Sequence, residues 1–173
     1  DVTEQKRLKN ELQFAALRDH LTGLWNRRHF IGLLDKARHQ KRRNDLDYCL
    51  LLLDVDHFKR INDQFGPQQG AETLILLART LEQRTRETDS VCRWGGEEFI
   101  VLLPQTDLAN AVHLAESLRI AVEQIREPQL PTITISIGVA QHAAEETTES
   151  LLRRADAALY QAKAAGRNRV VIA

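Results

Sequence analysis

Apolar residues recur along the chain at two spacings, which predict helices in some segments and strands in others. Residues 4–18 place Leu8, Leu12 and Ala15 among charged side chains, a spacing of four and then three that is typical of an amphipathic helix. Helical periodicity returns at 70–85, 107–125 and 147–166, and a further helix is expected to end near RHQKRRND. By contrast, YCLLLLD (48–54) is short and continuously apolar, which predicts a strand buried on both faces.

Four further strands complete the pattern. SVCRW and EEFIVLLP flank Gly95-Gly96, which predicts a hairpin. PTITISIGVAQ (131–141) is rich in β-branched residues, and RVVIA closes the chain. Strands mixed with helices and one hairpin predict an α/β fold: a single domain whose central mixed β-sheet is wrapped by helices.

Composition narrows the class of protein without identifying a function. The 173 residues are 43% hydrophobic and 28% charged, as in an ordinary globular domain. Lys plus Arg and Asp plus Glu each count 24, so charge gives no reason to expect a nucleic-acid partner. No apolar run approaches the roughly 20 residues that span a bilayer, so we expect no direct membrane contact by this domain.

The first residues of the chain and its two cysteines indicate the kind of protein and the cellular compartment to expect. The chain begins DVTEQKRLKN, without Met or a signal peptide, so we expect a piece of a longer protein. Cys49 and Cys92 lie in apolar runs, which favours buried thiols in a reducing cytosol over a disulfide or redox role. We therefore expect a cytoplasmic location, either free or as the output domain of a membrane-bound sensor.

The stretch LLLLDVDHFKRIND brings candidate chemistry to a strand end. Four leucines lead to Asp54 and Asp56, and ligands gather at such strand ends in open α/β sheets. Mg²⁺ suits these carboxylates because it binds through one or two of them together with substrate phosphates. The strand is expected to end between the two, so one of them is a candidate for a structural role. Asp54 is the preferred ligand, and Lys59 could meet a phosphate.

A second acidic stretch, RWGGEEFIVLLP (93–104), supplies a partner for this site. If the YCLLLLD strand lies beside this hairpin, Glu97 or Glu98 would face Asp54. The glycines would make a tight turn and let an anionic ligand approach the backbone. An Asp and a Glu that hold Mg²⁺ over a triphosphate suit phosphoryl or nucleotidyl transfer. Spacing alone also allows an ordinary acidic surface turn.

Five ordered motifs resemble the GGDEF family of bacterial diguanylate cyclases, in its frequent Glu variant. They are DHLTGLWNRR, DVDHFKRIND, GGEEF, ISIGVA and YQAKAAGRN, and the resemblance covers roughly residues 16–173. It implies the fold of class III nucleotide cyclases and polymerase palms. Residues 18–173 would form the cyclase domain, and residues 1–17 a linking helix at the end of an upstream coiled coil.

The resemblance also implies an activity. Such domains condense two GTP into cyclic di-GMP and release two pyrophosphates at the interface of a homodimer, with one GTP on each domain. Asp54, the Val55 carbonyl and Glu97 would hold two ions per site, Mg²⁺ or alternatively Mn²⁺. Glu97 would also act as the base toward the attacking 3′-hydroxyl, and the catalytic set is completed by Lys59 and Glu98.

Further residues acquire binding roles by the same resemblance. Lys163 and Arg167, one helical turn apart, would clamp the terminal phosphates, and Asn62 would read the guanine edge. The backbone N–H groups around His57 and Phe58 would cradle phosphate oxygens. The segment Arg86-Glu-Thr-Asp89 matches the RxxD motif of product inhibition, so cyclic di-GMP is expected as an inhibitor as well as the product. Arg43 would contact that ligand from the neighbouring domain.

One stretch departs from the family. The usual FGHxxGD reads FGPQQGA here, with Pro67 in place of His and Ala71 in place of the guanine-reading Asp. Loss of a buried charge-assisted hydrogen bond costs about 1.5–3 kcal/mol. Three alternatives follow: a weak but genuine cyclase, a synthase that accepts both GTP and ATP, or a non-catalytic module that senses cyclic di-GMP or docks other proteins. We also expect an upstream sensory or regulatory domain.

Overall fold

A five-stranded mixed sheet forms the centre of the computed structural model, which describes residues 1–173. β1 (Tyr48–Val55) lies in its middle, antiparallel to both β3 (Glu98–Pro104) and β4 (Ile135–Gln141). β2 (Ser90–Arg93) completes the hairpin with β3, and β5 (Val170–Ile172) runs parallel to β4 at the other edge. The strand order is therefore β2-β3-β1-β4-β5.

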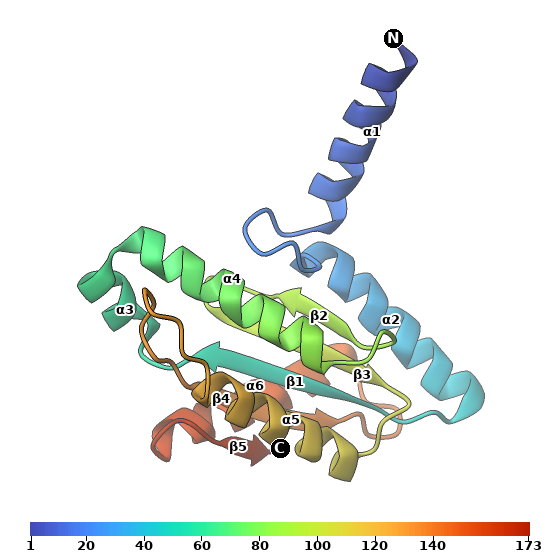
Figure 1. Ribbon diagram of the computed structural model, residues 1–173. Helices are drawn as coiled ribbons and strands as arrows, with labels where there is room; N and C mark the ends of the chain where they lie inside the picture. The colour runs from blue at the N-terminus through green and yellow to red at the C-terminus, as the bar shows by residue number, and fades with distance from the viewer.

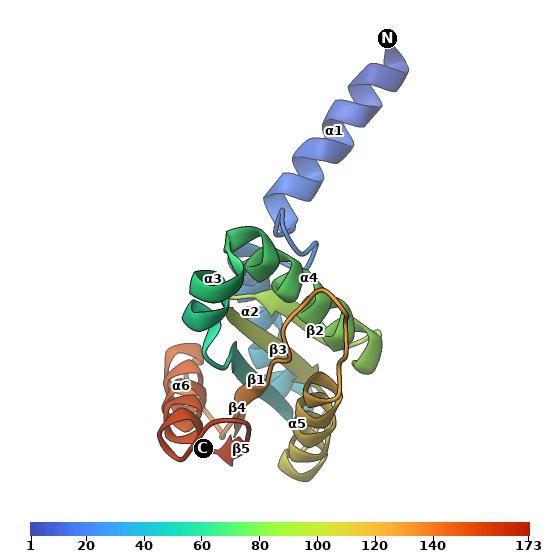
Figure 2. The same cartoon turned by 60° about the vertical axis from the view of Figure 1, so that its left-hand side comes forward.

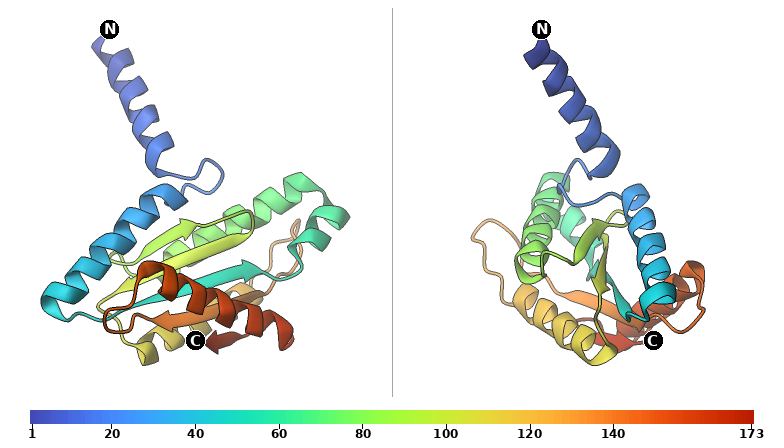
Figure 3. Two further views of the ribbon diagram at one scale, coloured as in Figure 1. Left: turned by 180° about the vertical axis from the view of Figure 1, so that it is seen from behind. Right: turned by 90° about the vertical axis from the view of Figure 1, so that its right-hand side faces the viewer.

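Helices cover both faces of this sheet. In Figure 1, α4 (Pro67–Arg84) and α5 (Leu108–Glu123) lie in front of it, and Figure 3 shows α2 (Arg27–Asn44) and α6 (Thr148–Ala164) on the opposite face. Alternation along β1 divides its leucines between the two layers: Leu51 and Leu53 join the core under α4 and α5, whereas Leu50 and Leu52 join the core under α2 and α6. Burial of both strand faces explains why β1 is continuously apolar.

Side-chain caps define where three of the helices that cover the sheet begin. Asn26 accepts from the N–H of His29 at the start of α2, and Asp107 and Thr147 cap α5 and α6 in the same way. α4 instead begins with Pro67, whose fixed φ and missing N–H suit the first helical position.

The N-terminal helix α1 (Val2–Leu17) stands away from the domain, as Figure 2 shows. None of its residues is buried, and the side chain of Leu12 is 72% exposed. Asn26 joins it to α2, because its Nδ2 donates to the Ala16 carbonyl and its backbone N–H to the Leu17 carbonyl. No helix of the protein is both long enough and apolar enough to cross a membrane.

The predicted fold class is confirmed, and the element boundaries need three corrections. The strand expected at 131–141 begins only at Ile135, because Thr134 bonds to Asp56 instead of to a neighbouring strand. Its carbonyl accepts from the Asp56 N–H, and its hydroxyl donates to the Asp56 carboxylate. The helix expected at 70–85 begins three residues earlier, at Pro67. A short helix not predicted from the sequence, α3 (Phe58–Phe65), follows β1.

Candidate functional site

Asp54 lies at the end of β1, opposite Glu98 of β3 and Ser136 of β4. It is only 3% exposed. Lys163 of α6 donates to its Oδ2, while its Oδ1 is buried without any hydrogen-bond partner. Burial raises the pKa of Asp54 to about 6; Lys163 opposes this rise, and the nearby charges of Glu97 and Glu98 add to it. A buried carboxylate with one free oxygen is suited to receive a cation.

The turn between β2 and β3 carries Glu97 next to this carboxylate. The Val55 N–H donates to the Glu97 carbonyl at 3.4 Å, so the turn lies against the end of β1. Arg93 holds the turn by donating from Nε and Nη2 to the Gly96 carbonyl at 3.1 and 2.9 Å, and Asp19 accepts from its Nη1.

Of the two roles predicted for the glycines of this turn, the structure supports open access to the backbone but not the need for glycine in the turn itself. Neither Gly95 nor Gly96 has a positive φ, so the turn does not depend on the left-handed freedom of glycine. The reversal is wide: the N–H groups of Trp94 and Gly95 both donate to the Glu98 carbonyl, at 2.8 and 3.2 Å. A Cβ added at Gly96 would meet nothing within 4 Å, which leaves open space over its backbone.

One cavity collects most of the predicted metal and phosphate ligands. Its lining consists of Asp54, Val55, Asp56, His57, Phe58, Lys59, Arg60, Asp63, Glu97, Lys163 and Arg167. Three of the residues predicted for the active site, Glu98, Asn62 and Ala71, are not part of this lining. Arg60 and Asp63 were not predicted as site residues, although both lie in the DVDHFKRIND motif that follows the buried strand.

Asp56, the other carboxylate of the DVD sequence, serves a structural purpose. Thr134 and Ser136 donate to it from their hydroxyl groups at 2.7 and 2.6 Å, and the Asn168 backbone N–H donates at 2.9 Å. Both of its oxygens are thus engaged, whereas one oxygen of Asp54 is free. This difference decides which of the two aspartates is available to a ligand.

The donor set of the cavity fits a divalent cation that also binds substrate. No group of three or more His, Cys, Asp or Glu side chains in the chain could hold a metal ion by itself. Asp54 and Glu97 nevertheless line one cavity with the strand end at Val55. Mg²⁺ commonly binds through one or two carboxylates and completes its shell with phosphate oxygens and water.

Lys163 and Arg167 line the cavity together but not on one helix. α6 ends at Ala164, and the chain then turns through Gly166, Arg167 and Asn168, all at positive φ. The expectation that the two cations lie one helical turn apart is therefore wrong. The side chains of Arg167 and Lys59 make no hydrogen bond or ion pair within the chain, so both can bind a ligand.

Asn62 of α3 lies directly against α4. An ideal Cβ built on Gly70 would come within 1.9 Å of the Asn62 Oδ1 and 3.3 Å of the Phe58 ring. Gly70 therefore makes room for the Asn62 side chain, immediately before Ala71. The structure thus brings positions 62, 70 and 71 together where α3 and α4 meet.

A second cavity contains the RxxD segment. Arg86 and Asp89 line it with Arg84, Leu103, Gln105, Thr106, Asn110 and Leu114. Asp89 accepts from the Arg86 backbone N–H at 2.8 Å and from its guanidinium at 3.0 Å, and Thr106 accepts from the same guanidinium at 2.7 Å. Arg43 does not line it; it lies at the end of α2 beside His39 and Arg42.

Known proteins resemble this chain over nearly its whole length. A family model described as Diguanylate cyclase, GGDEF domain, matches residues 16–169. The diguanylate cyclase DgcM of Escherichia coli K12 is 50% identical over 173 residues, which is all of this chain and 42% of the relative. The response regulator PleD of Caulobacter vibrioides is 43% identical, and the match covers 95% of this chain and 38% of PleD. The chain thus spans less than half the length of these relatives.

Solved structures of GGDEF domains have a similar fold. The coiled coil and GGDEF domain of DgcB from Caulobacter crescentus, solved in complex with c-di-GMP, matches with a TM-score of 0.90 at 32% identity. The match covers 99% of this chain and 95% of that one. GGDEF domains have the nucleotide cyclase and palm fold, so the predicted fold resemblance is confirmed.

Proposed function

Because this chain belongs to the GGDEF domain family of diguanylate cyclases, we propose that it joins two molecules of GTP into cyclic di-GMP and releases two pyrophosphates. The observation that carries the proposal is the cavity in which Asp54 and Glu97 meet four cationic side chains, those of Lys59, Arg60, Lys163 and Arg167. The carboxylates suit a metal ion, and the cations Lys59, Lys163 and Arg167 suit a triphosphate.

GGDEF diguanylate cyclases are generally metal dependent, and this site has a donor set that fits. Asp54, the Val55 carbonyl and Glu97 would hold Mg²⁺ or Mn²⁺, and two ions per site are expected. The unpartnered Oδ1 of Asp54 supports this assignment. When bound, such ions neutralise phosphate charge and lower the pKa of a coordinated hydroxyl.

The protein groups divide the remaining work between binding and proton transfer. Lys59, Lys163 and Arg167 would bind the phosphates, helped by the backbone N–H groups of His57 and Phe58. These amides lie at the start of α3, which has no side-chain cap to occupy them.

In each half-reaction the 3′-oxygen of one GTP bonds to the α-phosphorus of the other, and the bond from that phosphorus to the pyrophosphate leaving group breaks. The Glu97 carboxylate would accept the hydroxyl proton. Glu98, opposite Asp54 in the sheet, adds negative charge to the site and is proposed to support its affinity for cations.

The reaction requires two chains. Each domain would present one GTP, so each 3′-hydroxyl reaches the α-phosphate of the GTP on the partner only when two cavities face one another. We propose a homodimer that brings the cavities together, joined upstream through α1 and controlled by a sensory or regulatory domain.

The RxxD cavity is proposed as the site of product inhibition. Arg86 can bind a guanine edge or phosphate through its guanidinium, and Asp89 can accept guanine N–H groups. Both would have to exchange their present mutual contact for the ligand. Arg43 of the other domain would complete the site. Arg86→Ala should abolish cyclic di-GMP binding in calorimetry, and an unchanged affinity would refute the assignment.

Ala71 favours a second candidate function, a synthase that accepts ATP as well as GTP. A methyl group cannot accept the guanine ring N–H, so Asn62 would be the main base contact. Restoration of the carboxylate by Ala71→Asp should raise the ratio of GTP to ATP affinity about 10- to 100-fold. An unchanged ratio, measured with non-hydrolysable analogues, would mean that the base is read elsewhere.

The experiment that tests the proposed function is an incubation with GTP, ATP or both in the presence of Mg²⁺, followed by mass spectrometry of the products. We expect cyclic di-GMP from GTP, and its loss in a folded Glu97→Gln variant. Binding of cyclic di-GMP without any turnover would identify a receptor module instead. Turnover by Glu97→Gln at the unaltered rate would refute the role of Glu97.

A further inference from the structure

The turn that carries Arg167 has an unfavourable backbone conformation. Gly166, Arg167 and Asn168 have φ values of 126°, 64° and 47°. Glycine adopts positive φ readily, and asparagine tolerates the left-handed region, but arginine seldom occurs there. Consecutive left-handed residues persist only where surrounding contacts fix them.

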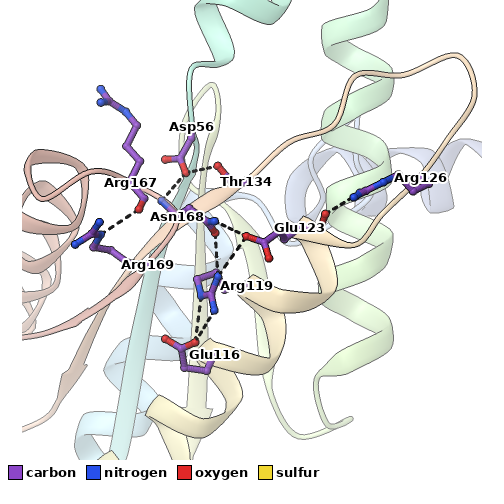
Figure 4. A network of polar contacts seen from close by, with 9 residues as sticks. All are labelled: Asp56, Glu116, Arg119, Glu123, Arg126, Thr134, Arg167, Asn168 and Arg169. Carbon is purple, nitrogen blue, oxygen red and sulfur yellow. Dashed lines mark hydrogen bonds and ion pairs between the residues drawn. The ribbon is translucent and has the colours of Figure 1, made fainter.

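Asn168 supplies these contacts on both sides, as Figure 4 shows. Its backbone N–H donates to Oδ2 of the buried Asp56 at 2.9 Å. Its side-chain amide reaches α5, where Nδ2 donates to Glu123 and Oδ1 accepts from Arg119 at 3.1 Å. Arg119 and Glu123 also form an ion pair at 3.6 Å.

These anchors leave the neighbouring guanidinium free. The Arg167 side chain extends away from the network in Figure 4 and has no partner within the chain, although it lines the candidate active site. Its backbone is tied down, since its N–H donates to Ala162 and its carbonyl accepts from Arg169. An arginine whose backbone is held in place and whose guanidinium has no partner can bind an anionic ligand at a defined position.

We infer that Asn168 is a positioning residue that holds Arg167 toward the phosphates by tying its turn to Asp56 and to the Arg119–Glu123 pair of α5. The inference deepens the proposed function and rests on it. Asn168 itself touches neither substrate nor metal in this scheme. It acts through Arg167, and α5, which does not line the cavity, thereby takes part in phosphate binding.

Calorimetric titration with inorganic tripolyphosphate tests the inference without requiring turnover. Asn168→Ala should weaken binding about tenfold, approaching the loss in Arg167→Ala. The double variant should bind no more weakly than Arg167→Ala alone, because the two residues act as one unit. Arg126→Ala, which removes an α5-end cation that bonds only to backbone carbonyls, is the matched control and should bind normally.

Two further variants separate the side chain from the backbone. Asn168→Gly keeps the left-handed conformation and the N–H to Asp56 but lacks the bonds to α5, so it should weaken binding by a smaller factor than Asn168→Ala. Glu123→Ala should weaken tripolyphosphate binding as well, and this variant replaces Asn168→Ala in the test if Asn168→Ala does not fold. Affinity for guanosine should stay unchanged in all of them.

Additive losses in the double variant, or normal tripolyphosphate binding by Asn168→Gly and Glu123→Ala, would overturn the inference. If the variants lose tripolyphosphate affinity as expected but the wild-type protein forms no cyclic di-GMP, the proposed function would be refuted and the inference about Asn168 would stand.

Discussion

At the scale of single residues, Gly70 shows how one missing side chain can serve a neighbouring one. The space that its Cβ would fill is occupied by the Asn62 amide. Gly70 lies in α4 without a positive φ, so the helix itself does not require glycine there. Its role is to seat Asn62, and stability and nucleotide binding should therefore respond to its replacement in different ways.

Gly70→Ala should displace Asn62 and weaken GTP-analogue binding about tenfold, while the free energy of unfolding changes by less than about 1 kcal/mol. The displaced atom is the end of a flexible side chain, so the helix can accept the methyl group. Gly32→Ala is the control, since a Cβ at that helical position meets nothing within 4 Å. Calorimetry and urea unfolding measure the two effects. Equal GTP affinity in both variants would contradict the proposed role of Asn62.

Glu146 gives the clearest pH dependence of stability. Arg154 donates to both of its oxygens at 2.7 Å, and Ser150 and the Ala143 N–H add further hydrogen bonds. The hydrogen bonds from Arg154 are the main cause that lowers the pKa of Glu146 from about 4.5 to about 2. A carboxyl group whose pKa is lower in the folded than in the unfolded state stabilises the fold at pH values above its unfolded-state pKa. This stabilisation is lost as the pH falls through the folded-state pKa.

Glu146→Gln should accordingly destabilise the protein by roughly 3 kcal/mol at pH 7. The difference from the wild type should shrink by roughly 1.4 kcal/mol at pH 3.5, because the unfolded wild-type chain is by then mostly protonated at this site. Urea unfolding at the two pH values measures it. Glu127→Gln, an exposed carboxylate without side-chain partners, should show no such change. A constant difference across this range would contradict the assignment.

At the scale of elements, the close approach of α6 to β4 sets the position of Lys163. A Cβ built on Gly138 of β4 would come within 2.3 Å of the Ala155 carbonyl oxygen and 2.5 Å of the Leu159 nitrogen. Both atoms belong to the backbone of α6 and cannot turn aside. The helix therefore lies on the sheet at a distance that only glycine allows, and this distance brings Lys163 to Asp54.

Gly138→Ala should force α6 away from the sheet, with a loss of stability of about 1–3 kcal/mol and weaker tripolyphosphate binding. Thermal unfolding and calorimetry are the measurements. Leu159→Ala in the same chain should not restore stability, because the obstructing atoms are backbone atoms. Full rescue by that second substitution would show that the contact is one between side chains.

The elements also show what the sequence could predict and what it could not. The apolar run of β1 and the periodic helices were predictable, because burial on both faces or on one stripe leaves a clear pattern. α3 was not, since it has eight residues and starts at a left-handed His57 without a side-chain cap. The predictions of Asp54 and Glu97 rested on motifs. The turn at 166–168 was marked only in part, because Gly166 and Asn168 are residue types that adopt positive φ and Arg167 between them is not.

At the scale of the whole molecule, activity should depend on protein concentration. α1 presents Leu8 and Leu12 to solvent, and a second copy of the helix could cover them. Leu8→Asp with Leu12→Asp should lower specific activity at low concentration without changing the unfolding of the domain, since α1 buries none of its residues. Activity assays and sedimentation across a dilution series measure this.

The matched control for that variant is Asn10→Asp with Gln13→Asp, which adds the same charge on the opposite face of the same helix. This control should dimerise and turn over normally. Undiminished activity of the leucine variant, in a protein that sedimentation shows to be monomeric, would contradict the proposed dimer.

The isolation of α1 also determines how the molecule unfolds. A helix of 16 residues that buries none of them is marginal in water, and the domain holds its C-terminal end through the hydrogen bonds of Asn26. In a dilute monomer its amides should exchange hydrogen almost as fast as those of a free peptide, while those of β1 remain protected up to global unfolding. Pairing of two chains would supply the missing packing, so the helix would become ordered as the dimer forms. The order of this one element would thus report, amide by amide, how much of the protein is assembled.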